Sequence, residues 1–203
     1  MKQMWEERYS EEGFAYGEQA NEYFKTKIDQ LEAGKLLLPA EGEGRNAVYA
    51  ASKGWQVHAF DQSENAQKKA HLLAQKHQVN IDYRVENIHH IKYQPENYDA
   101  LALIYAHFPP EHRENFHRKL GSYLKPGGWV IIEGFSKNNL ALSQGQAASN
   151  GPKNLGMLFS TEEIASDFDG FDILELEEKN IQLNEGKYHQ GEVSVIRLLA
   201  RKQ

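Results

Sequence analysis

Hydrophobic residues in this chain gather in short runs, and between the runs they recur every three or four positions. The runs have the length and composition of buried strands and cover residues 35–39, 55–60, 80–85, 98–106 and 129–135. The stretches between them predict helices near residues 45–53, from an N-cap at Ser63, and from Pro109–Pro110. This alternation predicts a Rossmann-like, doubly wound α/β fold, with a mostly parallel sheet between two layers of helices.

The last quarter of the chain has a different pattern. Residues 137–156 are rich in Asn, Ser, Gln and Gly, and they predict a long mobile loop without secondary structure. Ser160, with Glu163 three positions later, is typical of a capping box at the start of a short helix.

Two β-rich segments, residues 171–183 and 191–200, close the chain with no helix between them. They predict an antiparallel hairpin around a turn at residues 184–191, which completes a sheet of about seven strands. No repeat and no second domain is visible. We therefore expect a single domain over residues 1–203, with residues 1–34 as an N-terminal helical segment.

Composition narrows the range of partners. The 203 residues include no cysteine, which excludes disulfides and thiolate metal ligands and favours a reducing, cytoplasmic setting. We expect no signal peptide and no membrane contact, since the longest apolar run, ALALIYA, is too short to cross a bilayer. A net charge of −6 also argues against a nucleic-acid partner. A small molecule is the expected partner, and the sequence leaves the oligomeric state open.

The segment LLLPAEGEGRNAVYA, residues 36–50, predicts a strand, a tight loop and a helix. Gly42, Gly44 and Ala47 match the spacing of the dinucleotide fingerprint GxGxxG/A, and Asp61 ends the next strand, where an acid binds ribose hydroxyls. The glycines alternatively form no more than a tight turn. Because the loop and Asp61 lie at consecutive strand ends, a cofactor site is the favoured interpretation.

The charge of the loop favours one kind of cofactor. Glu41 and Glu43 would repel a pyrophosphate, with Arg45 as the sole offset nearby, whereas a sulfonium is cationic. S-adenosylmethionine therefore suits the loop better than NAD does. A nucleotide-dependent oxidoreductase of Rossmann type is the alternative, although it would usually need a second domain for its substrate.

These residues resemble the class I S-adenosylmethionine-dependent methyltransferases over nearly the whole chain. EGEGRNAVYAASKGWQVHAFDQS is similar to the first glycine motif of the family, LKPGGWVIIEGF is similar to its fifth strand, and the terminal hairpin is similar to its sixth and seventh strands. Within the class, MWEERYSEEGFAYGEQANEYF and GRN resemble the small tellurite-resistance and thiopurine methyltransferases.

One departure from the family pattern is clear. Leu38 and Ala40 stand where the family carries an acid and its first glycine. Our hypothesis is that Glu41 supplies the charge lost at Leu38. The same departure keeps open a third possibility, a non-catalytic binding protein on the methyltransferase fold.

The resemblance implies a set of cofactor contacts. It implies that Asp61, beside Gln62 and Ser63, binds the ribose hydroxyls, and that the site includes Gly42, Gly44 and Arg45. The remaining implied contacts are an adenine-edge group of Glu86, Asn87 and Ile88, a floor of residues 105–107 beneath the methyl group, and an aromatic lid of Trp5, Tyr9 and Tyr16. In structural terms, Glu86 also fits an ordinary polar turn, and the aromatic residues also fit a staple that holds the first helix.

The resemblance implies an acceptor such as a thiol, a thiopurine or a chalcogen oxyanion. His107 is the predicted general base, because it follows the fourth strand at the ligand end of the sheet. Tyr188 or His189 could border the acceptor pocket. Lys153 could meet an anionic acceptor, although a solvated loop lysine is the simpler interpretation.

The histidines do not predict a metal site. His107, His112 and His117 recur every five residues, which places their side chains about 140° apart on a helix. Residues 112–119 are instead expected to form a solvated helix face.

Overall fold

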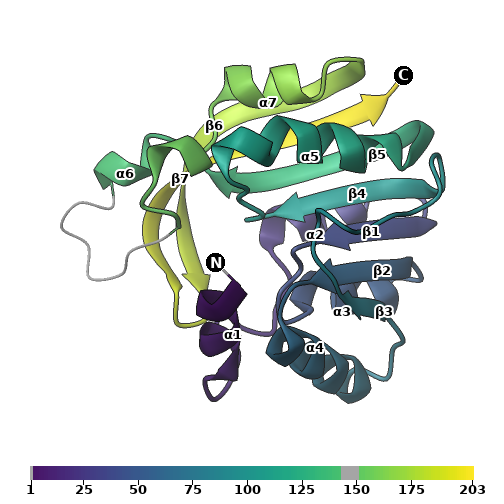
Figure 1. Ribbon diagram of the computed structural model, residues 1–203, viewed down its shortest axis with the longest axis vertical. Coiled ribbons are helices and arrows are strands. Elements are labelled where there is room, and N and C mark those ends of the chain that lie inside the picture. Colours follow the sequence, from purple (N-terminus) through teal and green to yellow (C-terminus); the bar gives the residue numbers. More distant parts are fainter. Residues whose placement is uncertain (1, 143–150) are drawn as a thin grey trace.

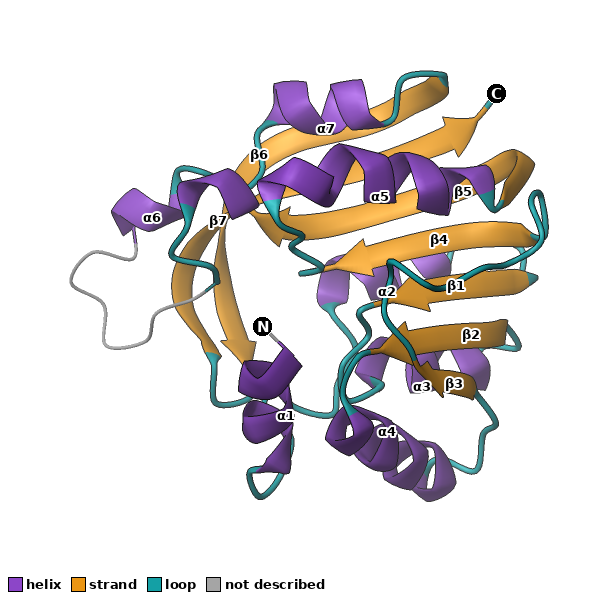
Figure 2. Ribbon diagram, viewed as in Figure 1, coloured by secondary structure: helices purple, strands orange, loops and turns teal. Residues whose placement is uncertain are grey.

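The computed structural model describes residues 2–142 and 151–203 and contains one seven-stranded sheet (Figures 1 and 2). The strands are β1 (Lys35–Pro39), β2 (Gln56–Asp61), β3 (Asp82–Val85), β4 (Tyr98–Ile104), β5 (Leu124–Phe135), β6 (Phe171–Glu185) and β7 (His189–Lys202). Their order is β3-β2-β1-β4-β5-β7-β6; the first five are parallel, and β7 is antiparallel to both of its neighbours. The predicted α/β fold with a terminal antiparallel hairpin is confirmed.

The helices begin where their capping residues predict. They are α1 (Lys2–Ser10), α2 (Glu22–Ile28), α3 (Arg45–Ser52), α4 (Glu64–Lys76), α5 (Pro110–Ser122), α6 (Asn139–Leu142) and α7 (Thr161–Asp167), with a 3₁₀ turn η1 (Leu155–Met157). The Ser63 hydroxyl accepts a hydrogen bond from the backbone N–H of Ala66 at the start of α4. Both hydrogen bonds of the predicted capping box join Ser160 and Glu163. None of the helices in the described ranges is long and apolar enough to cross a membrane.

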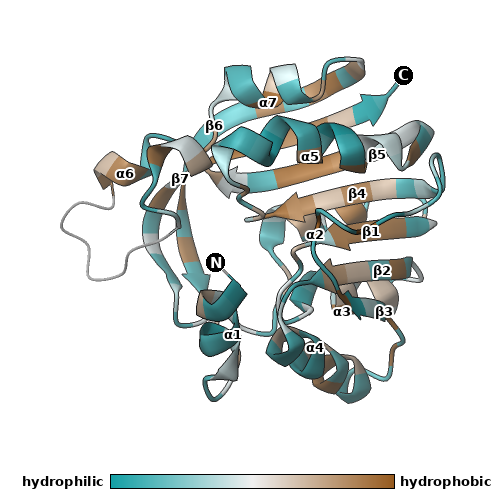
Figure 3. Cartoon of the chain, in the orientation of Figure 1, coloured by the Kyte–Doolittle hydropathy of each residue, from teal (hydrophilic) through white to brown (hydrophobic). Residues whose placement is uncertain are grey.

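Two apolar layers cover the faces of the sheet, because successive side chains of a strand point to opposite sides. Leu36 and Leu38 of β1 pack in the layer that contains α2 and α3, whereas Leu37 packs in the layer beneath α5 and α7. Brown ribbon is concentrated on the central strands, and the helices α1 and α4 are mostly teal (Figure 3). Because apolar side chains of the central strands point to both sides, the sheet is buried on both faces.

Several boundaries differ from the expectations. Strand pairing in the hairpin continues to Glu185 and His189, so the turn comprises residues 186–188 in place of 184–191. The prediction of a structureless segment over residues 137–156 is wrong at its ends, where α6 and η1 form. The α6 residue Asn139 is buried, and its side-chain oxygen accepts from the N–H of Ser194 in β7. Residues 143–150 of the predicted mobile loop lie outside the described residues.

The helix α5 does not present the wholly solvated face that was expected. Arg113 and His117 are buried, and both bond to the Asp167 carboxylate on α7, through Nε at 3.0 Å and Nδ1 at 2.8 Å. Burial raises the pKa of Asp167, but the contacts of His117 and Arg113 outweigh it and lower that pKa below its usual value. The ionised carboxylate therefore stabilises the fold at neutral pH, and its contribution is lost as the pH falls through the carboxyl range.

Asp167→Ala should destabilise the protein by ~3 kcal/mol, because it removes the acceptor of the buried His117 and leaves the buried Arg113 with its longer 3.4 Å contact to Glu163. Glu114→Ala is the matched control, since it breaks the exposed Glu114–Arg118 pair and should cost about 0.5 kcal/mol or less. Urea unfolding monitored by circular dichroism measures both. Equal losses in the two variants would contradict the structural role of Asp167.

Candidate functional site

The glycine loop lies at the carboxyl ends of the parallel strands. Gly42 and Gly44 adopt φ angles of 64° and 86°, and Gly44 is the N-cap of α3. A side chain is excluded at both positions, since a Cβ would lie 2.7 Å from the Tyr9 hydroxyl at Gly42 and 2.6 Å from the Ala70 Cβ at Gly44. The loop is therefore buried and held tightly between α1 and α4, where the two glycines permit the close approach of Tyr9 and Ala70.

Ala40 adopts a backbone conformation that glycine favours. Its φ of 52° is left-handed, a conformation that a residue with a Cβ rarely adopts. This is the position at which the related family carries its first glycine, so the chain keeps the backbone shape without the residue that favours it.

Asp61 joins the end of β2 to this loop. Its Oδ2 accepts from the N–H of Gly42 at 3.2 Å, its Oδ1 accepts from the N–H of Ser63 at 3.0 Å, and the residue is 7% exposed. Burial raises the pKa of Asp61 to about 6, against the opposing effect of the backbone hydrogen bonds. Tyr83 of β3 donates to the Gly42 carbonyl and fixes the loop from the other side.

Both loop glutamates are bound within the protein. The Oε1 of Glu41 accepts from the N–H groups of Asn46 and Ala47, at 2.9 and 2.8 Å, and so caps the start of α3. Burial raises the pKa of Glu41 to about 7. Glu43 accepts from the N–H of Ala15 at 2.7 Å and pairs with Lys69 at 2.8 Å. The expectation that both charges face the ligand freely does not hold, so the loop charge is a weaker guide to the cofactor than the sequence suggested.

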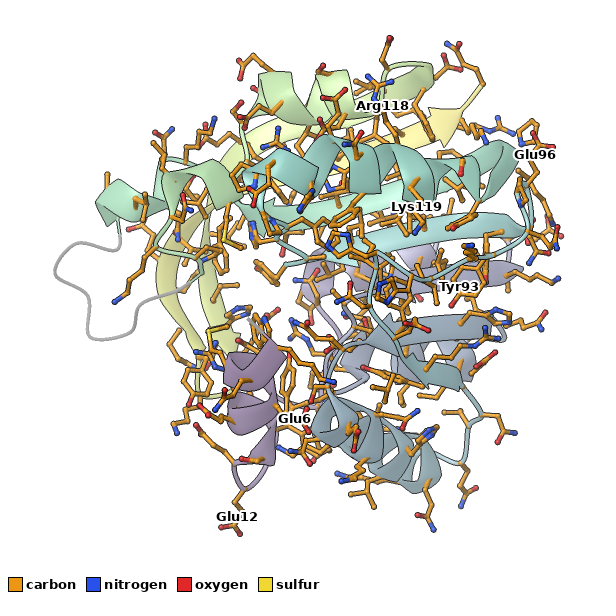
Figure 4. All side chains as sticks on the ribbon, viewed as in Figure 1. Glu6, Glu12, Tyr93, Glu96, Arg118 and Lys119 are labelled. Carbon is orange, nitrogen blue, oxygen red and sulfur yellow. The ribbon has the colours of Figure 1, made fainter. Side chains whose placement is uncertain are left out.

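The N-terminal segment is fastened over the loop through α4. Glu6 of α1 lies beside α4, and its Oε1 accepts from the N–H of Asn65 at 3.2 Å (Figure 4). Lys69 of α4 donates to the carbonyls of Glu11 and Gly13. These contacts bring α1 against the carboxyl ends of β1 and β2.

The three aromatic residues of the predicted lid lie together. Trp5 stacks on Tyr9 with 5.5 Å between ring centroids, and it lies 6.5 Å from Tyr16. Because Tyr9 also contacts Gly42, this cluster both anchors α1 and covers the glycine loop.

Sequence reasoning missed the buried acid Glu133 on β5. Its Oε1 accepts from Asn21 at 2.6 Å and from the Tyr105 hydroxyl at 2.9 Å, and its Oε2 pairs with Arg197 at 2.7 Å. A carboxylate within the apolar run WVIIEGF was the available signal, because a buried acid requires partners.

Glu185 at the end of β6 was also missed. It accepts from Arg45 at 2.8 Å and from Nδ1 of His189 at 3.2 Å. Burial raises the pKa of Glu185, but the hydrogen bond from His189 and the charge of Arg45 outweigh it and lower that pKa to about 2. An ionised carboxylate can only accept, so Nδ1 of His189 carries the proton and the lone pair lies on Nε2.

The ring of His189 completes the site from the hairpin. It lies 4.4 Å from the rings of both Tyr16 and Tyr105, and 5.3 Å from Phe135. Tyr105 follows β4 directly with a left-handed φ of 54°, a strained backbone of the kind that is often found at functional sites. The lid, the end of β4 and the hairpin therefore converge on one point.

The contacts of His107 oppose its prediction as a general base. Nδ1 lies 2.8 Å from the Met157 carbonyl, which can only accept, and Nε2 accepts from the N–H of Phe135 at 3.0 Å. Both ring nitrogens are thus in use, and burial lowers the pKa of His107 to about 4. The side chain fastens the segment around η1 to β5 and has no lone pair left for a substrate proton.

The remaining predicted residues have the following contacts and exposure. Gln62 is partly exposed beside Asp61, and the N–H of Glu86 donates to the Asp61 carbonyl at 2.9 Å. The Glu86 carboxylate accepts from the N–H of Asn87, as in a polar turn, while Ile88 packs against the core. Lys153 is exposed. Across residues 2–142 and 151–203, no group of three or more His, Asp or Glu side chains could hold a metal ion.

Comparison with known proteins agrees with this geometry. Residues 39–128 match the family model described as a methyltransferase domain. A probable S-adenosyl-L-methionine-dependent methyltransferase, TehB of Haemophilus influenzae, is 21% identical over 186 residues, which cover 86% of this chain. The chain spans 62% of the length of that curated relative.

Solved structures show the same fold. The crystal structure of TehB from Haemophilus influenzae has a TM-score of 0.73 at 20% identity, over 91% of this chain and 63% of TehB. A protein from the conversion of a disulfide bond into a thioacetal group during echinomycin biosynthesis has a TM-score of 0.75 at 17% identity, over 100% of this chain and 92% of its own. The [4+2]-cyclase SpnF has a TM-score of 0.67 at 15% identity, over 94% and 87% of the two chains.

The chain therefore has the class I methyltransferase fold, with a methyltransferase-domain match over residues 39–128 and a likeness to TehB.

Ala40→Gly should leave the free energy of unfolding unchanged or raise it by up to about 1 kcal/mol, because relief of the left-handed strain offsets the added entropy of the unfolded chain. The control Ala47→Gly, in the buried helical part of α3, should lose about 1 kcal/mol or more. Urea unfolding of both variants gives the comparison. A loss at Ala40 as large as that at Ala47 would show that its backbone carries no strain.

Proposed function

We propose that this protein transfers the methyl group of S-adenosylmethionine to a small-molecule nucleophile. The observation that carries the proposal is the bond between Asp61 and the N–H of Gly42, beneath the aromatic cover of α1. It combines an acid at the end of β2 with a glycine loop at the end of β1, the arrangement in which α/β folds bind nucleoside cofactors.

The residues present fit such a cofactor. The buried carboxylate of Asp61 is held by backbone N–H groups alone, and its raised pKa suits hydroxyl donors such as those of a ribose. Gly42 and Gly44 hold the loop in its left-handed turn between Tyr9 and Ala70, and residues 86–88 continue along the same edge to meet the adenine. Trp5 and Tyr16 then cover the site, and Tyr105 forms its floor at the end of β4.

Glu41 compensates for the acid missing at Leu38 in this proposal. Its carboxylate caps α3 through Oε1, and its Oε2 has a longer contact of 3.4 Å with the Asn46 side chain. Because burial raises the pKa of Glu41 to about 7, the carboxyl is about half ionised at neutral pH, and a cationic amino group bound beside it would favour the ionised form.

When bound, S-adenosylmethionine supplies a methyl group on a sulfonium that is already a good leaving group. The protein then has to align the acceptor and exclude water, tasks for which the aromatic rings around Tyr105 are suited. The S–CH₃ bond breaks as the acceptor lone pair forms the new bond to carbon, and a neutral thiol must also give up its proton. Nε2 of His189, which Glu185 orients, has no hydrogen-bond partner among the described residues, whereas Nε2 of His107 accepts from Phe135.

We infer that the acceptor is a soft nucleophile of the thiol, thiopurine or chalcogen-oxyanion type. The resemblance of the N-terminal segment and of GRN to the tellurite-resistance and thiopurine methyltransferases supports this class, and such nucleophiles ionise near neutral pH or are already anionic.

Titration of S-adenosylhomocysteine by calorimetry tests the cofactor site. Asp61→Asn should weaken binding about 10- to 100-fold, because it removes the ionic acceptor of the ribose hydroxyls. Glu41→Gln should weaken it about tenfold if Glu41 neutralises the amino group. Asp82→Asn, in an exposed pair with Arg84 on β3, is the control and should leave the affinity unchanged.

Three outcomes would count against these assignments. An unchanged dissociation constant in Glu41→Gln would remove Glu41 from the site. Stabilisation of the wild type by NAD or NADP, but not by S-adenosylmethionine, in a thermal-shift assay would favour an oxidoreductase. Cofactor binding without turnover across thiols, thiopurines and selenite would favour a non-catalytic binding protein.

His189→Gln should lower kcat/KM for a neutral thiol at pH 7 at least about tenfold, because the variant lacks the lone pair that takes the thiol proton. Selenite, which is already anionic, should lose much less. Methyl transfer from radiolabelled S-adenosylmethionine to the two acceptors measures the ratio. The same loss on both acceptors would assign His189 a packing role. The control His107→Gln should lower stability but leave the ratio of kcat/KM for the two acceptors unchanged.

A further inference from the structure

Arg8 on α1 is a cation without an acidic partner. Five arginines form ion pairs with carboxylates, and they are Arg45, Arg84, Arg113, Arg118 and Arg197. In the part of the chain that the structure describes, no carboxylate oxygen lies within 4.0 Å of the Arg8 guanidinium. Residues 143–150 contain no Asp or Glu, so they supply none either.

Three acids near this end of the molecule are each bound to a cation other than Arg8. Glu11 pairs with Lys187 at 2.6 Å, Glu43 with Lys69 at 2.8 Å, and Glu185 with Arg45 at 2.8 Å. Glu6, Glu7 and Glu12 of the same segment have no cationic partner among the described residues, so Arg8 is distinguished by its place beside the site and not by an excess of positive charge.

Aromatic side chains hold the guanidinium in place. Its Cζ lies 5.2 Å from the ring centroid of Trp5 and 4.4 Å from that of Tyr188, and Nη1 donates to the Tyr16 hydroxyl at 2.8 Å. The side chain is partly buried, and a guanidinium has five N–H donors, of which one is used here. Such a group is fixed in position yet able to donate to a ligand.

Arg8 also borders the proposed site. The ring of Tyr16 lies 4.4 Å from His189 and 6.1 Å from Tyr188, while Tyr9, the next residue of α1, contacts Gly42. Arg8 therefore lies between the glycine loop and the hairpin residue that faces the end of β4.

We propose that Arg8 is the anion-binding residue of this site and recognises a carboxylate or oxyanion of a bound ligand. The inference rests on the proposed function, because two ligands there can supply this chemistry. One is the carboxylate of the cofactor, and the other is an anionic methyl acceptor. A planar guanidinium suits both, since it donates two parallel hydrogen bonds to such a group.

Two ligands that differ in their amino-acid portion separate the sources. S-adenosylhomocysteine carries the carboxylate and the amino group, and 5′-methylthioadenosine keeps the adenosine and the thioether without either. Arg8→Met removes the charge but keeps an unbranched stem against the two rings, and Arg8→Lys keeps the charge without the fork. Calorimetry gives the two affinities, and KM is measured for 3-mercaptopropionate and for the neutral thiol 2-mercaptoethanol.

Either of two results supports the assignment. A loss of about tenfold or more for S-adenosylhomocysteine in Arg8→Met, with less than about twofold for methylthioadenosine, identifies the cofactor carboxylate. Unchanged affinities with KM raised about tenfold for mercaptopropionate alone identify the acceptor. In both cases Arg8→Lys should recover part of the loss.

Other results overturn it. Equal losses for both adenosine ligands would mean that Arg8 merely braces α1, and no change in any of the four measurements would exclude an anion contact. Arg201→Met is the control, because among the described residues Arg201 also has no carboxylate partner and lies over a ring, that of Trp129, but is exposed at the opposite end of the sheet. It should change none of the four values.

Failure of the proposed function is distinguishable from failure of this inference. If wild-type protein does not bind S-adenosylhomocysteine, the proposed function fails. A thermal shift with selenite alone then decides the role of Arg8. Stabilisation of the wild type but not of Arg8→Met supports an anion site, and no stabilisation of the wild type overturns it.

Discussion

The guanidinium of Arg45 holds together three parts of the chain that are far apart in sequence. It donates to the carbonyls of Tyr16 and Gln19 in the N-terminal segment and to Glu185 in the hairpin, while Arg45 itself begins α3 directly after the glycine loop. Because the group is nearly buried, these charge-assisted bonds are stronger than similar ones at the surface. Arg45 thereby holds the N-terminal segment, the glycine loop and the hairpin together at the carboxyl ends of the parallel strands. The site depends on this arrangement.

The acids around Arg45 have different roles, according to whether a cation neutralises them. Glu43, Glu133 and Glu185 are neutralised by Lys69, Arg197 and Arg45, and they join segments to one another. Within residues 2–142 and 151–203, Asp61 is held by backbone N–H groups without a cation, and Arg8 is held by aromatic rings without an acid. The internal ion pairs therefore leave out Asp61, an acceptor at the glycine loop, and Arg8, a donor on α1.

The class I methyltransferase fold fixes where in the molecule a reaction takes place more firmly than it fixes which reaction that is. Neighbours of the same fold include TehB and the [4+2]-cyclase SpnF, and a shared fold does not fix the reaction. In this chain the side chains that contact Tyr105, at the end of β4, come from β5 and from the hairpin, and they are Glu133, Phe135 and His189.

The sequence by itself determined the order of elements, the glycine loop, the acid at Asp61 and the capping residues Ser63 and Ser160, since these depend on local spacing and backbone chemistry. It also carried the family likeness. The tertiary structure decided which polar groups were already bound. His107 was locked between Met157 and Phe135, both loop glutamates were bound within the protein, and His189 was brought to Tyr105. These outcomes depend on contacts between residues distant in the chain. No local sequence pattern encodes whether the donors and acceptors of a buried side chain already have partners.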